Sequence, residues 1–274
     1  MASISVVITC KGRLEHLRQT LPLLARNLAD AEIILVDYDC PEACGDWAEA
    51  NVPGVLVVRV KNRPVFNLAK ARNLGIARAS APWLLLADAD VLFNTPLPAS
   101  IAPMTMAPAI LLPDPRPAEL YGTVLVPRAD TLAVGAYDET FEGWGAEDED
   151  FLMRLELRGL ERRRFDGAGI DVIHHDDTLR TRFHDRGRAL AWTLNCLYLA
   201  AKHDLLRLDQ RLSPKGWQAL YDSLRKELDR AAGQDGAVSQ TVSQQVHFRR
   251  ERIGGLELAT TLAYVAELDS EPAA

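Results

Sequence analysis

The chain has 274 residues, of which 48% are hydrophobic and 25% are charged, and its formal net charge is −7. This composition is typical of one large α/β unit, or of a core domain with an appendage, and it differs from that of disordered, collagen-like or membrane chains. The excess of acidic residues argues against a nucleic-acid partner bound through overall positive charge.

The sequence shows no membrane or disulfide signature. The longest apolar candidate, residues 189–201, is interrupted by Thr193 and Asn195, and the N-terminal apolar run is short, β-branched and without a basic region. The four cysteines are too few for a disulfide scaffold. We therefore expect a soluble, cytoplasmic protein without a transmembrane segment, and we do not expect zinc at Cys40 and Cys44.

Strands and helices are predicted to alternate in the first third of the chain. Runs with little polar alternation, as in strands buried on both faces, lie at residues 4–9, 32–36, 55–60 and 83–87. Leucines at three- and four-residue steps predict a helix over residues 14–28, which Pro22 should kink or divide. Residues 67–79 have a similar helical pattern. This alternation predicts βαβ units and a mostly parallel, open sheet with ligands beyond the carboxyl strand ends.

The remaining elements are predicted in chain order. Residues 95–120 are rich in Pro and Ala, which indicates a loop or irregular crossing before a strand at residues 122–126. A helix opens near residue 147 and ends near Arg158, with Gly159 as its cap. Three helical patterns follow residue 188, at residues 189–202, 217–230 and 257–268, and the polar residues 233–243 predict a mobile connection.

Two acidic pairs directly follow predicted strands, namely Asp37 with Asp39 and Asp88 with Asp90. The carboxyl ends of parallel strands meet at one sheet edge, so we expect these side chains to converge there. Carboxylates hold divalent cations, which neutralise the charge of a phosphoryl or glycosyl leaving group. Aspartates also begin turns, but the buried strand end favours Asp88 and Asp90 as ligands of a metal, directly or through water.

The most specific segment is residues 141–151, Phe-Glu-Gly-Trp-Gly-Ala-Glu-Asp-Glu-Asp-Phe. Acids at a helix N-terminus complement the helix dipole, which explains one or two of these carboxylates but less well four beside Gly-Trp-Gly. We interpret one carboxylate as a general base and Trp144 as an apolar face for a sugar ring.

A histidine pair, His174-His175, follows the strand-like residues 169–173. Neighbouring side chains on a strand point to opposite faces, so at most one of the two should enter the site as a further metal ligand, unless both belong to a loop. The role of His184 stays undecided. The histidines interpreted as structural or solvated are His16, His203 and His247.

Five motifs follow one another within residues 3–180. They are Thr9-x-Lys11-x-Arg13, Asp37, Ala71-Arg72-Asn73-Leu74-Gly75-Ile76, Asp88-Ala89-Asp90 and Gly143-Trp144-Gly145-x-Glu147-Asp148. The chain resembles glycosyltransferase family 2, and its second half resembles the bacterial chondroitin-polymerase and β-1,4-galactosyltransferase type.

The resemblance implies a GT-A fold, an α/β architecture with a Rossmann-like, mostly parallel central sheet flanked by helices. Residues 1–187 would form this catalytic domain, with the nucleotide-sugar bound by about residues 1–95 and the acceptor by about 120–187, and residues 188–274 a helical C-terminal region.

The resemblance also implies residues for the donor and the metal. The expected donor-binding residues are Thr9, Lys11, Arg13, Asp37, Arg72, Asp88 and Ala89. Asp37 would contact the nucleotide base, although Tyr38-Asp39-Cys40-Pro41 replaces the usual second acid and Gly-Ser turn, which leaves the base open. The expected ligands of Mn²⁺ or Mg²⁺ are Asp88 and Asp90 with His174 or His175.

Catalysis is assigned by the same resemblance. Asp148 lies where these inverting enzymes place the catalytic base, and Glu147 lies where they contact the acceptor, beside Trp144 and Gly145. Retaining polypeptide N-acetylgalactosaminyltransferases resemble this segment but carry Glu-Asn instead of Glu-Asp, which favours inversion here.

We therefore predict an inverting, metal-dependent glycosyltransferase that uses a nucleoside-diphosphate sugar, expected to be a UDP-sugar, and an acceptor hydroxyl. One alternative is a non-catalytic nucleotide-sugar-binding module, which the intact acids oppose. The other is a sugar nucleotidylyltransferase, which requires a glycine-rich loop where this chain has only Gly12. The amphipathic helices beyond residue 188 are expected to pack on the catalytic domain or to form a homodimer contact.

Overall fold

The computed structural model describes residues 3–98, 101, 107–232, 240–249 and 259–268. The chain forms two compact units. The first comprises Met1–Glu139 and Asp148–Asp185, and the second comprises Thr140–Glu147 and Arg186–Ala274.

A seven-stranded sheet forms the centre of the first unit, in the order β3-β2-β1-β4-β7-β6-β8. Its strands are β1 (Ile4–Cys10), β2 (Glu32–Tyr38), β3 (Leu56–Val60), β4 (Trp83–Asp88), β6 (Ile110–Asp114), β7 (Val124–Pro127) and β8 (Arg162–Asp166). β1 is parallel to β2 and β4, β2 to β3 and β6 to β8, whereas β7 is antiparallel to β4 and β6. The predicted α/β architecture with a mostly parallel sheet is confirmed.

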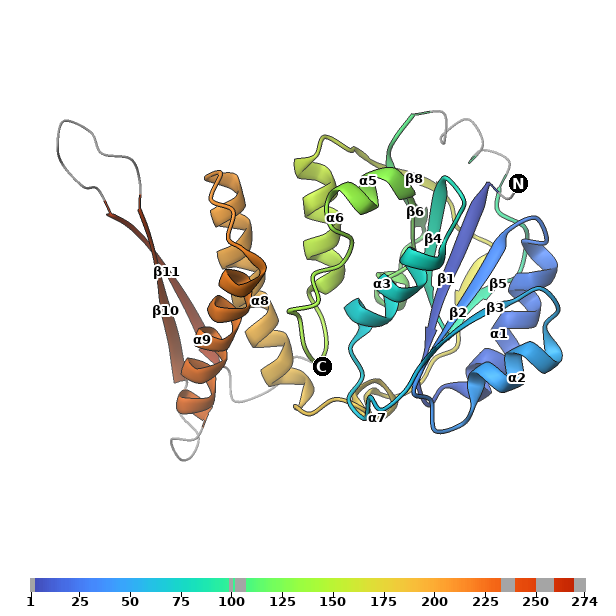
Figure 1. Ribbon diagram of the computed structural model, residues 1–274, viewed down its shortest axis with the longest axis horizontal. Coiled ribbons are helices and arrows are strands. Elements are labelled where there is room, and N and C mark those ends of the chain that lie inside the picture. Colours follow the sequence, from blue (N-terminus) through green and yellow to red (C-terminus); the bar gives the residue numbers. More distant parts are fainter. Residues whose placement is uncertain (1–2, 99–100, 102–106, 233–239, 250–258, 269–274) are drawn as a thin grey trace. The chain divides into compact units, whose positions relative to one another are not determined.

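Helices cover both faces of this sheet (Figure 1), with α1 (Leu14–Asn27) and α2 (Cys44–Asn51) on one side and α3 (Leu68–Arg78) and α6 (Glu147–Leu157) on the other. Alternation along β1 explains the two layers, because consecutive side chains of a strand point to opposite faces. Val6 belongs to the apolar cluster that contains Leu17 and Leu21 of α1, and Val7 belongs to the cluster that contains Ile76 and Phe151.

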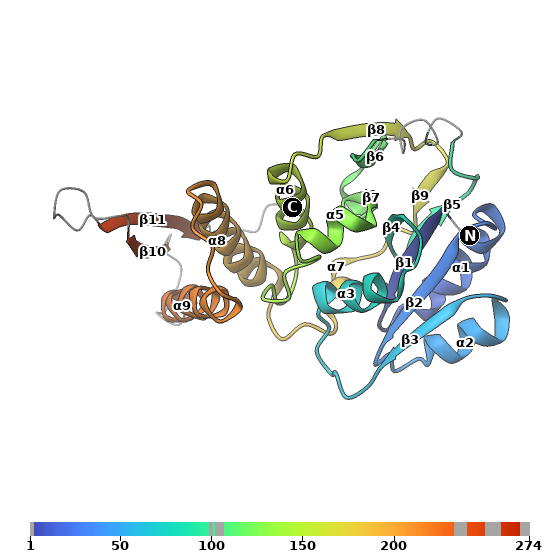
Figure 2. The ribbon, with the colours of Figure 1, turned by 45° about the horizontal axis from the view of Figure 1, so that its top comes forward.

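Shorter elements complete the first unit, as Figure 2 shows from a second direction. They are β5 (Val91–Phe93), η1 (Ala118–Leu120), α5 (Arg128–Ala133), β9 (Ile170–Val172) and α7 (Asp177–Thr181). β5 pairs with β9 in antiparallel fashion, which brings the segment after β4 beside the segment that precedes the histidine pair.

The second unit contains two helices, α8 (Arg188–Arg207) and α9 (Pro214–Ala232), and two antiparallel strands, β10 (Gln240–Arg249) and β11 (Ala259–Leu268). Its apolar core includes Phe141 and Ala146 together with Leu194, Tyr198 and Tyr221 of the helices. Within the ranges that the structure describes, no helix is long and apolar enough to cross a bilayer.

Two predictions about secondary structure are wrong. Residues 259–268 form β11 instead of part of the helix predicted at 257–268, so the region beyond residue 188 is not purely helical. Thr260, Thr261 and Val265 are β-branched and favour a strand, and pairing with β10 supplies backbone partners that the local pattern does not reveal. Residues 110–114, predicted as irregular, form the buried strand β6 because Ile110, Leu111 and Leu112 pair between β7 and β8.

Two further expectations concern α1 and the polar connection. Pro22 does not divide α1, which continues from Leu14 to Asn27 because one missing backbone donor is offset by burial of Leu17, Leu21 and Leu24. Of the connection predicted at residues 233–243, residues 233–239 lie outside the described ranges and the rest begin β10.

Candidate active site

The register of the central strands brings the acidic residues to one edge. Cys10 lies opposite Asp37 across β1 and β2, and Thr9 lies opposite Asp88 across β1 and β4. The carboxyl ends of these three strands are therefore level, and the loops that follow them form the candidate site, as expected for an open parallel sheet.

Arg72 links two of the predicted acids. It lies on α3 with a fully buried side chain, and its guanidinium is 2.9 Å from Oδ1 of Asp88 and hydrogen-bonded to Oδ1 of Asp148. The Tyr137 hydroxyl accepts from Arg72 Nη1 at 2.7 Å and donates to Asp148 Oδ1 at 2.9 Å. One cation thus holds the acid at the end of β4 beside the acid in the first turn of α6.

Burial shapes the protonation of this cluster. It raises the pKa of Tyr137 well above the ordinary value, which keeps the phenol a hydrogen-bond donor. Burial also raises the pKa of Asp88, and Arg72 opposes that shift. Gly122 completes the cluster, because a Cβ there would lie 2.5 Å from Arg72 Nη2 and 3.2 Å from both Asp88 Oδ2 and Asp148 Oδ2. Tyr137 lies in no sequence motif and Gly122 was only the first residue of a predicted strand, so neither was predicted as a site residue.

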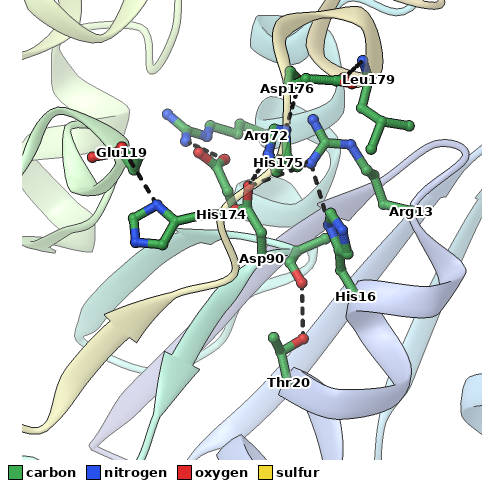
Figure 3. A network of polar contacts seen from close by, with 12 residues as sticks. Arg13, His16, Thr20, Arg72, Asp90, Glu119, His174, His175, Asp176 and Leu179 are labelled. Carbon is green, nitrogen blue, oxygen red and sulfur yellow. Dashed lines mark hydrogen bonds and ion pairs between the residues drawn. The ribbon is translucent and has the colours of Figure 1, made fainter.

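A second cluster lies around Asp90 (Figure 3). Its Oδ2 is 2.7 Å from Nε2 of His175, and these two atoms converge with a ring nitrogen of His16, all within 4.8 Å of one another. Arg13 Nη1 lies among them, 3.3 Å from Asp90 Oδ2, 2.7 Å from His175 Nε2 and 3.3 Å from His16 Nδ1. The positively charged guanidinium of Arg13 therefore lies between one carboxylate and two imidazole rings.

The two adjacent histidines point to different sides. The His175 side chain is 4% exposed and faces Asp90, whereas the His174 side chain is 79% exposed and lies 3.7 Å from Glu119. Asp88 is not among the ligand atoms that converge with Asp90 in the described part of the chain, and it pairs with Arg72 instead. The structure therefore separates Asp88 and His174 from the cluster at Asp90.

His16, interpreted from sequence as structural or solvated, lies at this cluster, and its ring stacks on that of His175 with centroids 5.3 Å apart. Burial lowers the pKa of His16, and the nearby Arg13 charge adds to this, so the ring favours its neutral form. The available signal was its spacing from Arg13, since positions three apart share one helix face.

Asp37 and Lys11 hold the loop after β2. Asp37 accepts hydrogen bonds from the backbone N–H groups of Cys40 at 2.9 Å and Gly45 at 3.1 Å. The buried ammonium of Lys11 donates to the carbonyl of Asp39 at 2.8 Å and to two further carbonyls, those of Tyr38 at 3.2 Å and Arg63 at 2.8 Å. These hydrogen bonds to backbone groups hold the loop after β2 in place at the edge of the candidate site.

Two further predicted donor residues lie at strand ends. Thr9 is buried near the end of β1, and Ala89, also buried, accepts a hydrogen bond through its carbonyl from the Thr20 hydroxyl of α1 at 2.8 Å. Both stand at the carboxyl edge of the sheet.

The Gly-Trp-Gly turn belongs to the second unit. The Asn195 side chain of α8 donates to the carbonyls of Glu142 at 3.0 Å, Trp144 at 3.4 Å and Gly145 at 2.8 Å. The Trp144 ring lies 4.2 Å from the Arg188 guanidinium carbon. Glu147, the first residue of α6, is buried, and Asp148 follows it directly in the chain.

The sheet with its acidic carboxyl edge has the architecture of GT-A glycosyltransferases. Residues 5–112 match the model of glycosyl transferase family 2, and residues 112–177 match the N-terminal domain of galactosyltransferase. Residues 5–177 therefore resemble glycosyltransferases of family 2 and of the galactosyltransferase type, and the chain has the GT-A fold.

Solved structures of S. aureus TarS share this fold. The crystal structure of S. aureus TarS 1-349 in complex with UDP is similar at a TM-score of 0.56 and 15% identity, with 83% of this chain and 70% of that chain covered. S. aureus TarS itself gives 0.51 and 16%, with 74% of this chain and 43% of that chain covered. A Drosophila β1,4-galactosyltransferase 7 mutant in complex with manganese, UDP-Gal and xylobiose gives 0.47 and 19%, covering 68% and 76% of the two chains.

Proposed function

We propose that the protein transfers a sugar from a UDP-sugar to an acceptor hydroxyl with inversion of the anomeric configuration. The observation that carries this proposal is the Arg72 bridge between Asp88 at the donor edge and Asp148 in the first turn of α6. Inversion is a single displacement, so the base must stand beside the bound donor when the acceptor attacks. In this assignment residues 1–95 bind the donor and residues 120–187 supply the acceptor side.

Asp148 is the general base in this proposal. Arg72 and Tyr137 both donate to its Oδ1 and so fix the orientation of the carboxylate. Oδ2 is the oxygen that we assign to the acceptor hydroxyl, whose proton it removes as the new bond forms. The side chain is 16% exposed, which supports access from solvent.

The cluster at Asp90 fits a divalent cation. Nδ1 of His175 lies 2.9 Å from the backbone carbonyl of Asp176, so in a neutral imidazole Nδ1–H donates and Nε2 keeps its lone pair. Nε2 lies 2.7 Å from Asp90 Oδ2 and 2.7 Å from Arg13 Nη1, so a positively charged group already stands beside these two candidate ligand atoms. A histidine held by a backbone carbonyl is also the usual arrangement of a metal ligand.

We therefore propose Asp90 and His175 as ligands of Mn²⁺ or Mg²⁺, with His16 as a third. Imidazole ligands favour Mn²⁺ over Mg²⁺, which prefers oxygen. When bound, the cation neutralises the diphosphate charge that develops as the glycosidic bond breaks. Arg13 is then available to pair with a phosphate oxygen.

The acceptor side is assigned to the Gly-Trp-Gly segment. The Trp144 ring offers an apolar face for a sugar, and the carboxylate of Glu147 suits a hydrogen bond to an acceptor hydroxyl. The contacts of Asn195 with the carbonyls of this turn support a rigid platform.

Ligand-dependent stabilisation tests donor and metal binding. Melting temperatures are measured with UDP, GDP, dTDP and CDP, each with and without Mn²⁺, because a ligand that binds only the native state raises the melting temperature. We expect the largest rise with UDP and Mn²⁺, and Asp90→Ala should remove the manganese-dependent part. Asp30→Ala, an exposed acid elsewhere in the first unit, is the control. An unchanged response in Asp90→Ala would contradict the assignment.

A further inference from the structure

Three cysteines of the first unit converge beside the proposed donor edge. Cys10 ends β1, Cys40 lies in the loop after β2 and Cys44 begins α2. Their sulfur atoms lie within 4.8 Å of one another, and all three are free cysteines. Cys10 and Cys44 are buried, and Cys40 is half-buried. Cys10 is distant from Cys40 and Cys44 in the chain and joins them only in the folded sheet.

The fold fixes this convergence. Cys10 lies opposite Asp37 in the pairing of β1 with β2. The Asp37 carboxylate then binds the backbone N–H groups of Cys40 and Gly45, which turns the loop back toward the end of β1. A Cβ at Gly45 would lie 2.7 Å from Asp37 Oδ2, so this closure depends on glycine.

The polar surroundings favour negative charge on one sulfur. The Gly12 N–H donates to Cys40 Sγ at 3.2 Å. Thiolates are the form of cysteine that binds metals.

The spacing suits a soft cation. A Zn–S bond is about 2.3 Å, so two sulfurs on one tetrahedral zinc lie roughly 3.8 Å apart. Sulfurs already within 4.8 Å of one another reach that separation with small side-chain rotations. Thiolates select Zn²⁺ over Mg²⁺ or Mn²⁺, which prefer oxygen ligands. The cluster is therefore chemically distinct from the carboxylate and imidazoles around Asp90.

We propose that Cys10, Cys40 and Cys44 form a second metal site, which binds a thiophilic divalent cation such as Zn²⁺ through three thiolates. The fourth position is open to water from the half-exposed side of Cys40. Because the site joins the ends of β1 and β2, the cation fixes the loop of residues 39–44 at the donor edge. The site does not depend on glycosyl transfer.

Cobalt spectroscopy tests the site directly. Reduced, metal-stripped full-length protein is titrated with Co²⁺, and the thiolate-to-cobalt charge-transfer band is followed, because oxygen and nitrogen ligands do not produce it. We expect one equivalent to bind with this band and Zn²⁺ to displace it. Cys40→Ser should lower the intensity of the band by at least about a third, because one of three thiolates is gone, and bind Zn²⁺ on the order of 100-fold more weakly. Cys196→Ser, which removes the cysteine of α8, should keep both properties.

A second measurement uses the unaltered protein in case Cys40→Ser fails to fold. The alkylation rate of Cys40 is measured by peptide mass spectrometry, and one equivalent of Zn²⁺ should lower it at least about tenfold while leaving Cys196 unchanged. The proposal is overturned if reduced wild-type protein gives no charge-transfer band, if Cys40→Ser retains the full intensity of the band, or if Zn²⁺ leaves the Cys40 rate unchanged. A disulfide between two of these cysteines in the reduced, zinc-treated protein would also contradict it. None of these measurements uses UDP or enzymatic turnover, so their outcome is independent of the proposed transferase activity.

Discussion

Arg13 is the residue whose place in the site conflicts with its predicted role. The resemblance assigns it to the donor, yet its Nη1 lies among Asp90, His175 and His16. A guanidinium and a divalent cation repel each other at such short range, so both cannot occupy the cluster. We therefore expect Arg13 to leave the cluster when a cation binds.

Arg13→Met tests this exchange, because methionine keeps much of the side-chain bulk without the charge. In nucleotide-free protein we expect Mn²⁺ to bind about tenfold more tightly to the variant, a change of about 1.4 kcal/mol, and UDP to bind more weakly in the presence of Mn²⁺. Isothermal titration calorimetry measures both affinities. Weaker Mn²⁺ binding in Arg13→Met would show that Arg13 supports the cluster instead of competing for it.

At the residue scale, the sequence predicted the acids but not their partners. Asp88, Asp90 and Asp148 stood out because each follows a strand or opens a helix within a motif. Tyr137 carries no motif, and it reaches Asp148 only because the chain folds back beside α3. The sequence also did not show which of His174 and His175 faces Asp90. Alternation along a strand predicts that the two side chains point to opposite faces, but only the structure shows that His175 is the one beside Asp90.

At the scale of elements, α8 positions the Gly-Trp-Gly turn through one buried side chain. Asn195 donates to three carbonyls of this turn and accepts from the Tyr221 hydroxyl at 2.9 Å. Removing such a group leaves buried polar atoms without partners.

Asn195→Ala is therefore expected to lower the free energy of unfolding by about 2 kcal/mol, as measured by urea denaturation. Thr193→Ala on the same helix is the matched control, because Thr193 is only half-buried and its hydroxyl donates within α8, to the Ala189 carbonyl. Equal stability of the two variants would show that Asn195 does not hold the turn.

The strands differ in how far the sequence predicts them. β1, β2 and β4 are nearly continuous apolar runs, which is the pattern of strands buried on both faces. β8 contains Arg162, Arg163 and Arg164 and shows no such pattern, because it is an edge strand whose place depends on pairing with β6. Whether such a segment forms a strand depends on its pairing with a strand distant in the sequence, and the local sequence pattern does not reveal that pairing.

At the scale of the whole molecule, the second unit contains a segment from the middle of the chain. Phe141 and Ala146 share one apolar core with Leu194, Tyr198 and Leu224 of α8 and α9. The C-terminal helices therefore bury the turn that precedes Asp148, and the two halves of this unit should not be stable apart.

Truncation after Arg186 tests this dependence. Loss of α8 and α9 exposes Phe141 and its neighbours, so we expect insoluble protein or a lower melting temperature. A truncation after Leu268 keeps both helices and is the control. A soluble residue 1–186 fragment with the melting temperature of the full chain would contradict this account. Sedimentation of the full chain separately tests the predicted homodimer contact.

If Asp148 is the base of an inverting transfer, its role can be tested without a known acceptor, because water can take the acceptor's place. Time-resolved ¹H NMR follows the sugar released during slow hydrolysis of an α-linked UDP-sugar in the presence of Mn²⁺. We expect the β-anomer to appear first, before mutarotation, and Asp148→Asn to slow release on the order of 100-fold or more while UDP with Mn²⁺ still raises the melting temperature. First release of the α-anomer, or full activity of Asp148→Asn, would contradict it.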